Sequence, residues 1–203
     1  MKKKSCILFG IVLMLASACV PRPRPVTQFN VETYTRPYQT DFDEVLTIVL
    51  DQAIPDDFVV RENLRPMQVL NFRNSLKLSL YYTFEDSFKD VRFLDTPSSE
   101  GISLHLYRIR PSWKIHTIDD QVTAVGDVVV SSSTYFISSM IRYDGILYRN
   151  GEKVKIMDEE VIGERVETNI RYWNEAFVDG VREMCEDLYQ QMAEEQKSFL
   201  TRK

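Results

Sequence analysis

The stretch FISSMIRYDGILYRNGEKVKIMDEEVIGERV (residues 136–166) carries the strongest information about the fold, because it joins two strand-like runs through turn signals. Two dipeptides compete for the turn, Asp144-Gly145 and Asn150-Gly151. If both were turns, the run between them would be too short for a strand. We therefore predict one hairpin that turns at Asn150-Gly151.

In this hairpin, residues 136–149 pair with residues 153–166, and Gly145 lies inside the first strand, at a bulge. Upstream, apolar and polar residues alternate over residues 102–107, which is typical of a strand with one buried face. Pro111 is expected to interrupt that strand. The remaining predicted elements are strands at 44–50, 57–61, 91–94, 113–115 and 122–130, and a turn at Asp119-Asp120.

Two helices are predicted from apolar residues that recur at three- and four-residue spacing. The first spans residues 66–88, and its stripe is Leu70, Phe72, Leu76, Leu80, Phe84 and Phe88. The second spans residues 170–192 with Asn169 as N-cap, and its stripe is Ile170, Trp173, Phe177, Val181, Met184, Leu188 and Met192. Each stripe is expected to be a packing face.

The order of these elements predicts the α+β class, as a two-layer sandwich with a mainly antiparallel sheet and two long helices on one face. The hairpin-rich centre argues against a doubly wound parallel sheet. We expect a single domain over residues 42–195 and a frayed tail over residues 196–203.

Residues 1–18 have the layout of a secretory signal peptide, with lysines first, then an apolar core, then small residues. Cys19 follows directly. The stretch resembles a bacterial lipoprotein signal, and this resemblance implies that Cys19 becomes the first residue and carries palmitate and other acyl chains. Ordinary cleavage after Ala18 without acylation is the alternative, since Ala16 stands where the family prefers Leu.

Residues 19–41 are rich in proline and predict an extended, solvated tether. At roughly 3 Å per residue, about 20 residues would hold the domain some 60 Å from the membrane at full stretch. Val20 follows Cys19, whereas an Asp at that position signals inner-membrane retention in enteric lipoproteins. The resemblance therefore implies a lipid anchor in the bacterial outer membrane, with the periplasmic face favoured.

The chain is acidic, with a formal net charge of −5 that becomes −8 without the three lysines of residues 2–4. Such a chain has no electrostatic footprint for nucleic acid, and anionic lipids would repel it. Membrane attachment is therefore expected through the lipid on Cys19. Cys185 is expected to be a buried small hydrophobe, or to form a disulfide with Cys19 if Cys19 is not acylated.

The sequence has no motif for a phosphate-binding loop, a nucleophile elbow or a zinc site, and we predict no catalytic residue, metal or cofactor. His105 and His116 would make a metal site only if they converged across the sheet with Asp119 or Asp120. A strand histidine on the solvent face and a loop histidine are the favoured interpretation.

Asp41, Asp43 and Glu44 would serve acid–base chemistry if the fold paired their carboxyl groups. Their position at the end of the tether favours turn and strand-entry roles. Trp113 is either a core residue, which we favour, or an aromatic residue of a protein-binding surface.

A wider resemblance rests on MQVLNFRNSL (67–76), the strand at 91–94, and RYDGILYRNG (142–151) ahead of the last helix. This arrangement resembles the small α+β lipoproteins that serve envelope machines, such as YajG-type lipoproteins and auxiliary lipoproteins of ABC-type lipid transport systems. The resemblance implies a non-enzymatic accessory subunit that binds an envelope transport or assembly protein through a sheet edge or a helix face. The alternative is a carrier of a hydrophobic ligand, in a cavity lined by Leu76, Leu80, Phe84 and Phe177.

Overall fold

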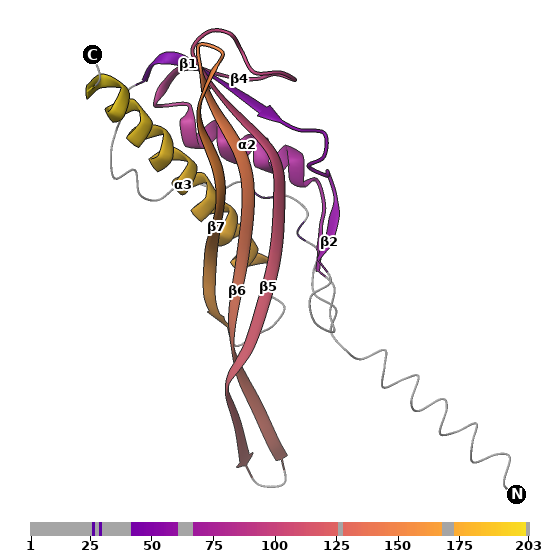
Figure 1. Cartoon of the computed structure of the whole chain (residues 1–203). Helices are drawn as coiled ribbons and strands as arrows, with labels where there is room; N and C mark the ends of the chain where they lie inside the picture. The colour runs from indigo at the N-terminus through magenta and orange to yellow at the C-terminus, as the bar shows by residue number, and fades with distance from the viewer. Residues whose placement is uncertain are drawn as a thin grey trace, which may run out of the picture.

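The computed structural model describes Val26, Phe29 and residues 42–60, 67–125, 128–167 and 173–201 (Figure 1). The predictions for the signal peptide, for Cys19 and for Asn169 lie outside these residues. The chain belongs to the α+β class, with a mostly antiparallel five-stranded sheet, a small second sheet and two described helices.

The main sheet has the strand order β4-β1-β5-β6-β7. Its strands are β1 (Phe42–Leu50), β4 (Phe88–Phe93), β5 (Ile102–Val125), β6 (Val128–Arg149) and β7 (Glu152–Glu167). β5, β6 and β7 are antiparallel, whereas β1 pairs in parallel with both β4 and β5. The small sheet pairs β2 (Phe58–Val60) with β3 (Met67–Val69) in antiparallel fashion.

The predicted hairpin is confirmed. β6 turns into β7 at Asn150 and Gly151, which have φ angles of 53° and 79°, as a tight hairpin turn requires. Phe136 lies opposite Val166 and Gly145 lies within β6, as expected. The irregularity beside Gly145 is on β5, between Leu106 and Arg108.

β5 and β6 differ from the prediction. Pro111 does not interrupt β5 but pairs with Ile141. β1 pairs with β5 only as far as Leu106, so Pro111 lies in an edge segment, where a missing N–H donor costs no ladder hydrogen bond. The predicted turn at Asp119-Asp120 lies inside β5.

The predicted strand at 122–130 is in fact a hairpin, in which Val125 pairs with Val128 across two residues. The sequence between them, Gly126-Asp127, is a dipeptide typical of a two-residue hairpin turn. The pairing of residues 122–125 with residues 128–131 therefore overrides the run of apolar residues that predicted one continuous strand.

The helices also end at other residues than predicted. α2 spans Phe72–Phe84 and α3 spans Trp173–Thr201. The helical spacing that included Leu70 and Phe88 is overridden by tertiary pairing, since β3 lies before α2 and Phe88 opens β4. Residues 197–201 continue α3, in place of the expected tail.

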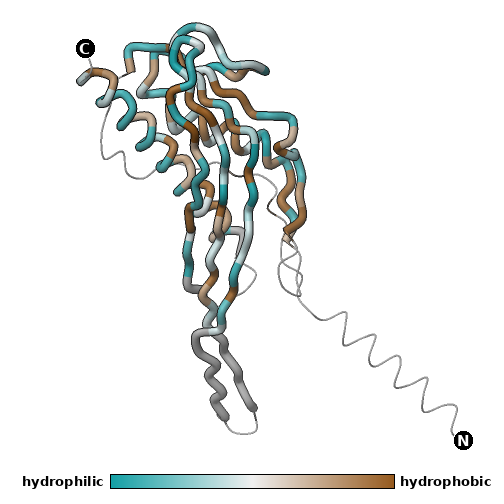
Figure 2. Tube along the Cα trace, viewed as in Figure 1, coloured by the Kyte–Doolittle hydropathy of each residue, from teal (hydrophilic) through white to brown (hydrophobic). Residues whose placement is uncertain are grey.

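Both helices cross behind the strands in Figure 1. We call the sheet face against them the inner face and the opposite side the outer face. Inner-face residues such as Leu104, Ile141 and Leu147 are buried with the apolar residues of α2 and α3 in one core. The strands accordingly alternate between hydrophobic and hydrophilic residues in Figure 2.

Val26 and Phe29 correct the expected tether. Val26 makes a parallel bridge to Val69, and Phe29 packs its ring against Phe72 and Phe177, with centroid distances of 6.1 and 5.5 Å. Both side chains are buried. The fold therefore includes residues ahead of residue 42, and the solvated spacer expected over 19–41 does not hold at these two positions.

Candidate functional site

Two neighbouring hollows lie at the end of the sheet that carries the Asn150-Gly151 turn, and Arg149 and Phe199 line both of them. The first hollow has a volume of about 280 Å³ and lies between α3 and the β6–β7 turn. The second has a volume of about 520 Å³ and lies over the start of β1. Because they share a wall and lie side by side, we take the two hollows together as the candidate site.

Arg149 is held in place by two other elements, β1 and α3. Its side chain is only 10% exposed and pairs with Glu44 of β1 at 3.3 Å. Its guanidinium donates to Gln196 and lies 4.2 Å from the ring centroid of Phe199, both on α3. The charge is thus neutralised and stacked, which fixes the wall between the two hollows.

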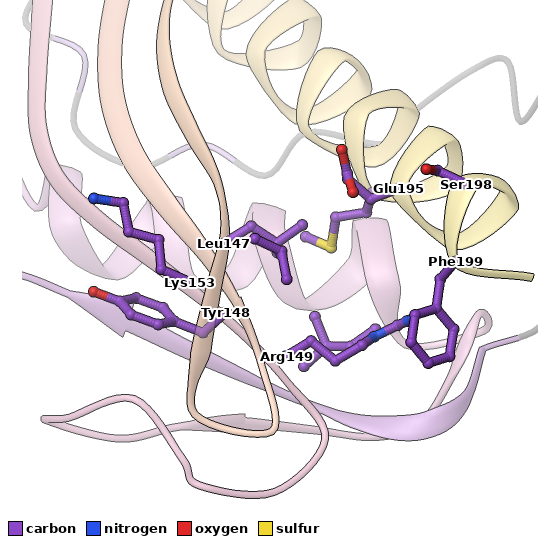
Figure 3. Close-up of a pocket in the computed structure, with 10 residues that line it drawn as sticks. Leu147, Tyr148, Arg149, Lys153, Glu195, Ser198 and Phe199 are labelled. Carbon is purple, nitrogen blue, oxygen red and sulfur yellow. The ribbon is translucent and has the colours of Figure 1, made fainter. Parts of the chain in front are cut away.

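The first hollow has an apolar base and a polar rim (Figure 3). Leu147 and Met192 are buried beneath it, and Lys153, Glu195 and Ser198 line it above them. None of the described lining residues is a histidine or a cysteine. This arrangement suits the binding of a side chain or small group that is part apolar and part polar.

The histidines do not converge. His105 and His116 lie eleven positions apart on β5, which is roughly 35 Å at strand spacing. His105 Nε2 is 3.7 Å from Asp51, and His116 is exposed opposite Phe136. In the described part of the chain, no three His, Cys, Asp or Glu side chains gather as metal ligands.

The acidic cluster separates as well. Asp43 pairs with Lys89 at 2.7 Å and is 91% exposed, whereas Glu44 pairs with Arg149. Asp41 lies outside the described residues. Trp113 belongs to the core, where it is 3% exposed and stacks on Phe177 at 5.4 Å.

Cys185 is free and buried between the helices. Burial raises the pKa of its thiol to about 12, against an opposing hydrogen bond with Thr83. A neutral, inaccessible thiol has the structural role that the sequence predicts.

A buried polar cluster links β6 to α3. Tyr143 donates a hydrogen bond to Asp187, and Gln191 donates to Tyr143 at 2.9 Å and to Asp187 at 2.6 Å. Burial, together with the hydrogen bond to Asp187, raises the pKa of Tyr143. On the outer face, the Arg108 hydrogen bond holds the pKa of Asp144 below its usual range.

Arg149, Gln196 and Phe199 are not among the site residues predicted from sequence. Arg149 lies two residues after Leu147 on β6 and so shares its inner face, where a charge needs a partner. Two of its partners, Gln196 and Phe199, lie in the stretch for which a frayed tail is predicted. The end of α3 is therefore the part of the site that local pattern could not supply.

Neither of the helices described here combines the length and the apolar character that a bilayer crossing requires. No family model and no curated protein matches the chain. Among solved structures, it is similar to a protein of family-model DUF330 from Xanthomonas campestris, at 11% identity and a TM-score of 0.44, over 88% of this chain and 98% of that one.

Two other similar structures are named as lipoproteins. The minor lipoprotein from Acinetobacter baumannii has 10% identity and a TM-score of 0.37, covering 75% of this chain and 94% of that one. The rare lipoprotein B from Shewanella oneidensis has 10% identity and a TM-score of 0.38, covering 76% and 98%. Two of these three similar structures are thus named as bacterial lipoproteins.

Proposed function

We propose that the chain is a non-enzymatic lipoprotein of the bacterial envelope, anchored through acylated Cys19 and acting as an accessory subunit of a transport or assembly system. The proposal places the anchor in the outer membrane, facing the periplasm, and the domain as a two-layer arrangement of sheet and helices. Its partner is an envelope protein that docks on the two hollows beside Arg149.

The closed core is the observation that carries this proposal. The side chains that would line a cavity for a carried ligand, Leu76, Leu80, Phe84 and Phe177, are all 0% exposed. None of them lines either hollow. Because a ligand carrier must keep a chamber that its cargo can enter, this packing favours the accessory role over the carrier.

The two hollows supply a binding surface for the partner of the accessory subunit. Arg149 joins β1, β6 and α3, so the wall between them is rigid before a partner arrives. A preformed surface loses less conformational entropy on binding. Its apolar base and charged rim resemble the anchor pockets of protein interfaces.

The docked residue Val26 shortens the link to the membrane. Only seven Cα steps separate it from Cys19, which span at most about 25 Å. The proposed anchor therefore holds the domain closer to the bilayer than the 60 Å tether first expected. A subunit held this near works on partners in or beside the same membrane.

The experiment has two parts. Intact-mass measurement of the full chain from membranes tests acylation, with Cys19→Ser as the control that should remain unacylated. Affinity capture from detergent-solubilised membranes then compares the wild type with Phe199→Asp, which places a charge in both hollows. Leu78→Asp, on the exposed face of α2, is the matched control.

We expect an envelope transport or assembly protein with the wild type and with Leu78→Asp, and at least about tenfold less with Phe199→Asp. Circular dichroism must show that Phe199→Asp remains folded. Recovery of lipid without protein would instead support the carrier. Equal recovery of the partner protein with Phe199→Asp would show that the partner does not dock on the two hollows.

A further inference from the structure

The outer face of β5–β7 separates its charges into columns. At three of the four outward positions 108, 110, 112 and 114, β5 carries a cation, and β7 carries an anion at the three corresponding positions. β6 lies between them. The β5 column is Arg108, Arg110 and Lys114, and the β7 column is Asp158, Glu160 and Glu164.

The strand register sets these residues in rows across the sheet. The rows, from β5 through β6 to β7, are Arg108–Asp144–Asp158, Arg110–Arg142–Glu160, Ser112–Met140–Ile162 and Lys114–Ser138–Glu164. A cation at one end of a charged row thus faces an anion at the other end, about 10 Å away across two strand spacings. Within one chain, the two ends of the last row are too far apart to pair.

Part of this charge is satisfied inside the chain. Arg108 pairs with Asp144, and Arg110 lies 3.8 Å from the same carboxylate with half of its side chain exposed. Arg142 binds Asp158 with two nitrogens, at 2.8 and 2.9 Å. Among the described residues, neither Lys114 nor Glu164 forms an ion pair. The rows hold four cations and four anions, so this face is neutral on a chain of net charge −5.

We propose that this outer face binds the outer face of a second copy of the chain. A two-fold axis parallel to β6 brings the β5 column of one copy over the β7 column of the other. Lys114 then meets Glu164 of the second copy, and Arg110 meets Glu160 of the second copy. Two sheets that pack face to face lie about 10 Å apart, with their strands nearly aligned.

The centre of the face is suited to this contact. Met140 lies on the middle strand, close to the proposed axis, so it meets Met140 of the second copy. Ile162 is 46% exposed beside it, and Ile156 is 59% exposed further along β7. Large apolar side chains this open to solvent on a sheet face are typical of a surface that binds a partner.

Charge identifies the partner as a second copy. A polyanion such as a lipid surface would need a face of net positive charge, and an acidic protein partner would meet the β7 column as well. Rotation about the two-fold axis places the cation column of each copy over the anion column of the other copy, so the face is complementary to itself. A two-fold axis parallel to the strands also keeps Val26 of both copies at the same end, as two chains anchored in one membrane require.

The size of the face sets the strength of the contact. Three strands are about 14 Å wide, and the rows from Ile156 to Glu164 span about 30 Å, or of the order of 500 Å² per copy. This is below the area of a standard interface, so chains free in solution associate weakly. Attachment to a common membrane, which rests on the proposed function, raises their effective concentration.

The test is cross-linking of the full chain through one new thiol, under oxidising conditions, in membranes and in the purified protein. Met140→Cys places the thiol near the axis, so a disulfide should join two copies. Leu78→Cys, exposed on α2, is the matched control. We expect at least about tenfold more cross-linked dimer from Met140→Cys than from Leu78→Cys.

Charge reversal then identifies the face. In the Met140→Cys chain, Lys114→Glu should reduce the dimer about tenfold, because it faces Glu164 of the second copy. Adding Glu164→Lys should restore it. A dimer yield no higher than with Leu78→Cys, a failure of the double reversal to restore it, or a cross-link to a different protein would each overturn the proposal.

The dimer and the proposed function can fail independently, because they are tested by different measurements. Intact mass reports acylation of Cys19 whatever the copies do, and the purified protein tests the face without a membrane. Raised salt should also weaken the dimer, since the end-of-row pairs are exposed.

Discussion

Gly163 and Gly180 lie where the backbones of α3 and the sheet approach each other closely, and they allow a sharp test of the packing. Gly163 lies on the inner face of β7 and Gly180 lies on α3. A Cβ at Gly163 would lie 2.2 Å from the Gly180 nitrogen and 2.7 Å from the Asp179 carbonyl carbon. Both contacts are with backbone, so no side chain can rotate away.

We therefore expect Gly163→Ala to push α3 from the sheet by about 1 Å, because real Cβ contacts begin above 3 Å. Overpacking of this kind costs 1–3 kcal/mol, and a clash with backbone belongs at the upper end, about 3 kcal/mol. For a domain of this size, that corresponds to a fall in Tm of roughly 6–12 °C.

Gly180→Ala is the matched control. Its Cβ would meet Ser139 Oγ at 3.1 Å and the Ile141 side chain at 3.2 Å, and both can shift by a few tenths of an ångström. Replacing a helix-interior glycine by alanine gains up to about 1 kcal/mol. The two effects oppose each other, so we expect a change within about 1 kcal/mol.

The assay is urea unfolding of both variants and the wild type, followed by circular dichroism, with m-values compared to confirm a common mechanism. If Gly163→Ala unfolds within about 0.5 kcal/mol of the wild type, the contact between α3 and β7 is not as described. The reasoning also fails if Gly180→Ala is the more damaging change.

Three further predictions follow from buried and paired groups. The thiol of Cys185, with its pKa raised to about 12, should react with a thiol reagent at neutral pH only when denaturant unfolds the chain, and prompt labelling of the native Cys19→Ser protein would contradict this. Tyr143→Phe should lower the free energy of unfolding by about 1–2 kcal/mol, because it leaves Gln191 and Asp187 short of a buried partner, and equal urea midpoints would contradict it. Because Arg108 lowers the pKa of folded Asp144, this carboxylate stabilises the fold above its ordinary pKa of 3.8 and the gain disappears as the pH falls toward the lower folded value. Asp144→Asn should therefore lose less stability than the wild type between pH 5 and pH 3, measured by urea midpoints.

The local sequence pattern predicted the structure correctly where the structure depends on a single strand pair or turn. The β6–β7 hairpin was predicted with its turn and its register, because Asn150-Gly151 is a strong turn signal and the side chains alternate on both sides. It failed at β5, where Pro111 is tolerated only because β1 ends at Leu106. That reason depends on the partner strand, which the local sequence does not contain.

The candidate site depended on contacts between distant segments. Arg149 needs Glu44 from the start of the domain and Phe199 from its end, and no local spacing connects these three. The parallel pairing of β1 with β4 and β5 is likewise a long-range choice. Sequence reasoning therefore predicted the fold class better than it predicted the site.

α3 relates the proposed anchor, the hollows and the second copy to one another. Phe29 packs on Phe177 near the start of α3, whereas Arg149 contacts Gln196 near its end. These positions are nineteen residues apart, which is about 28 Å along a helix. The hollows therefore lie far along α3 from Phe29, and the proposed two-fold axis along the strands presents two such sites on the same side of the dimer. A partner that bridges both sites would bind the dimer more tightly than one chain, because its second contact forms at high effective concentration.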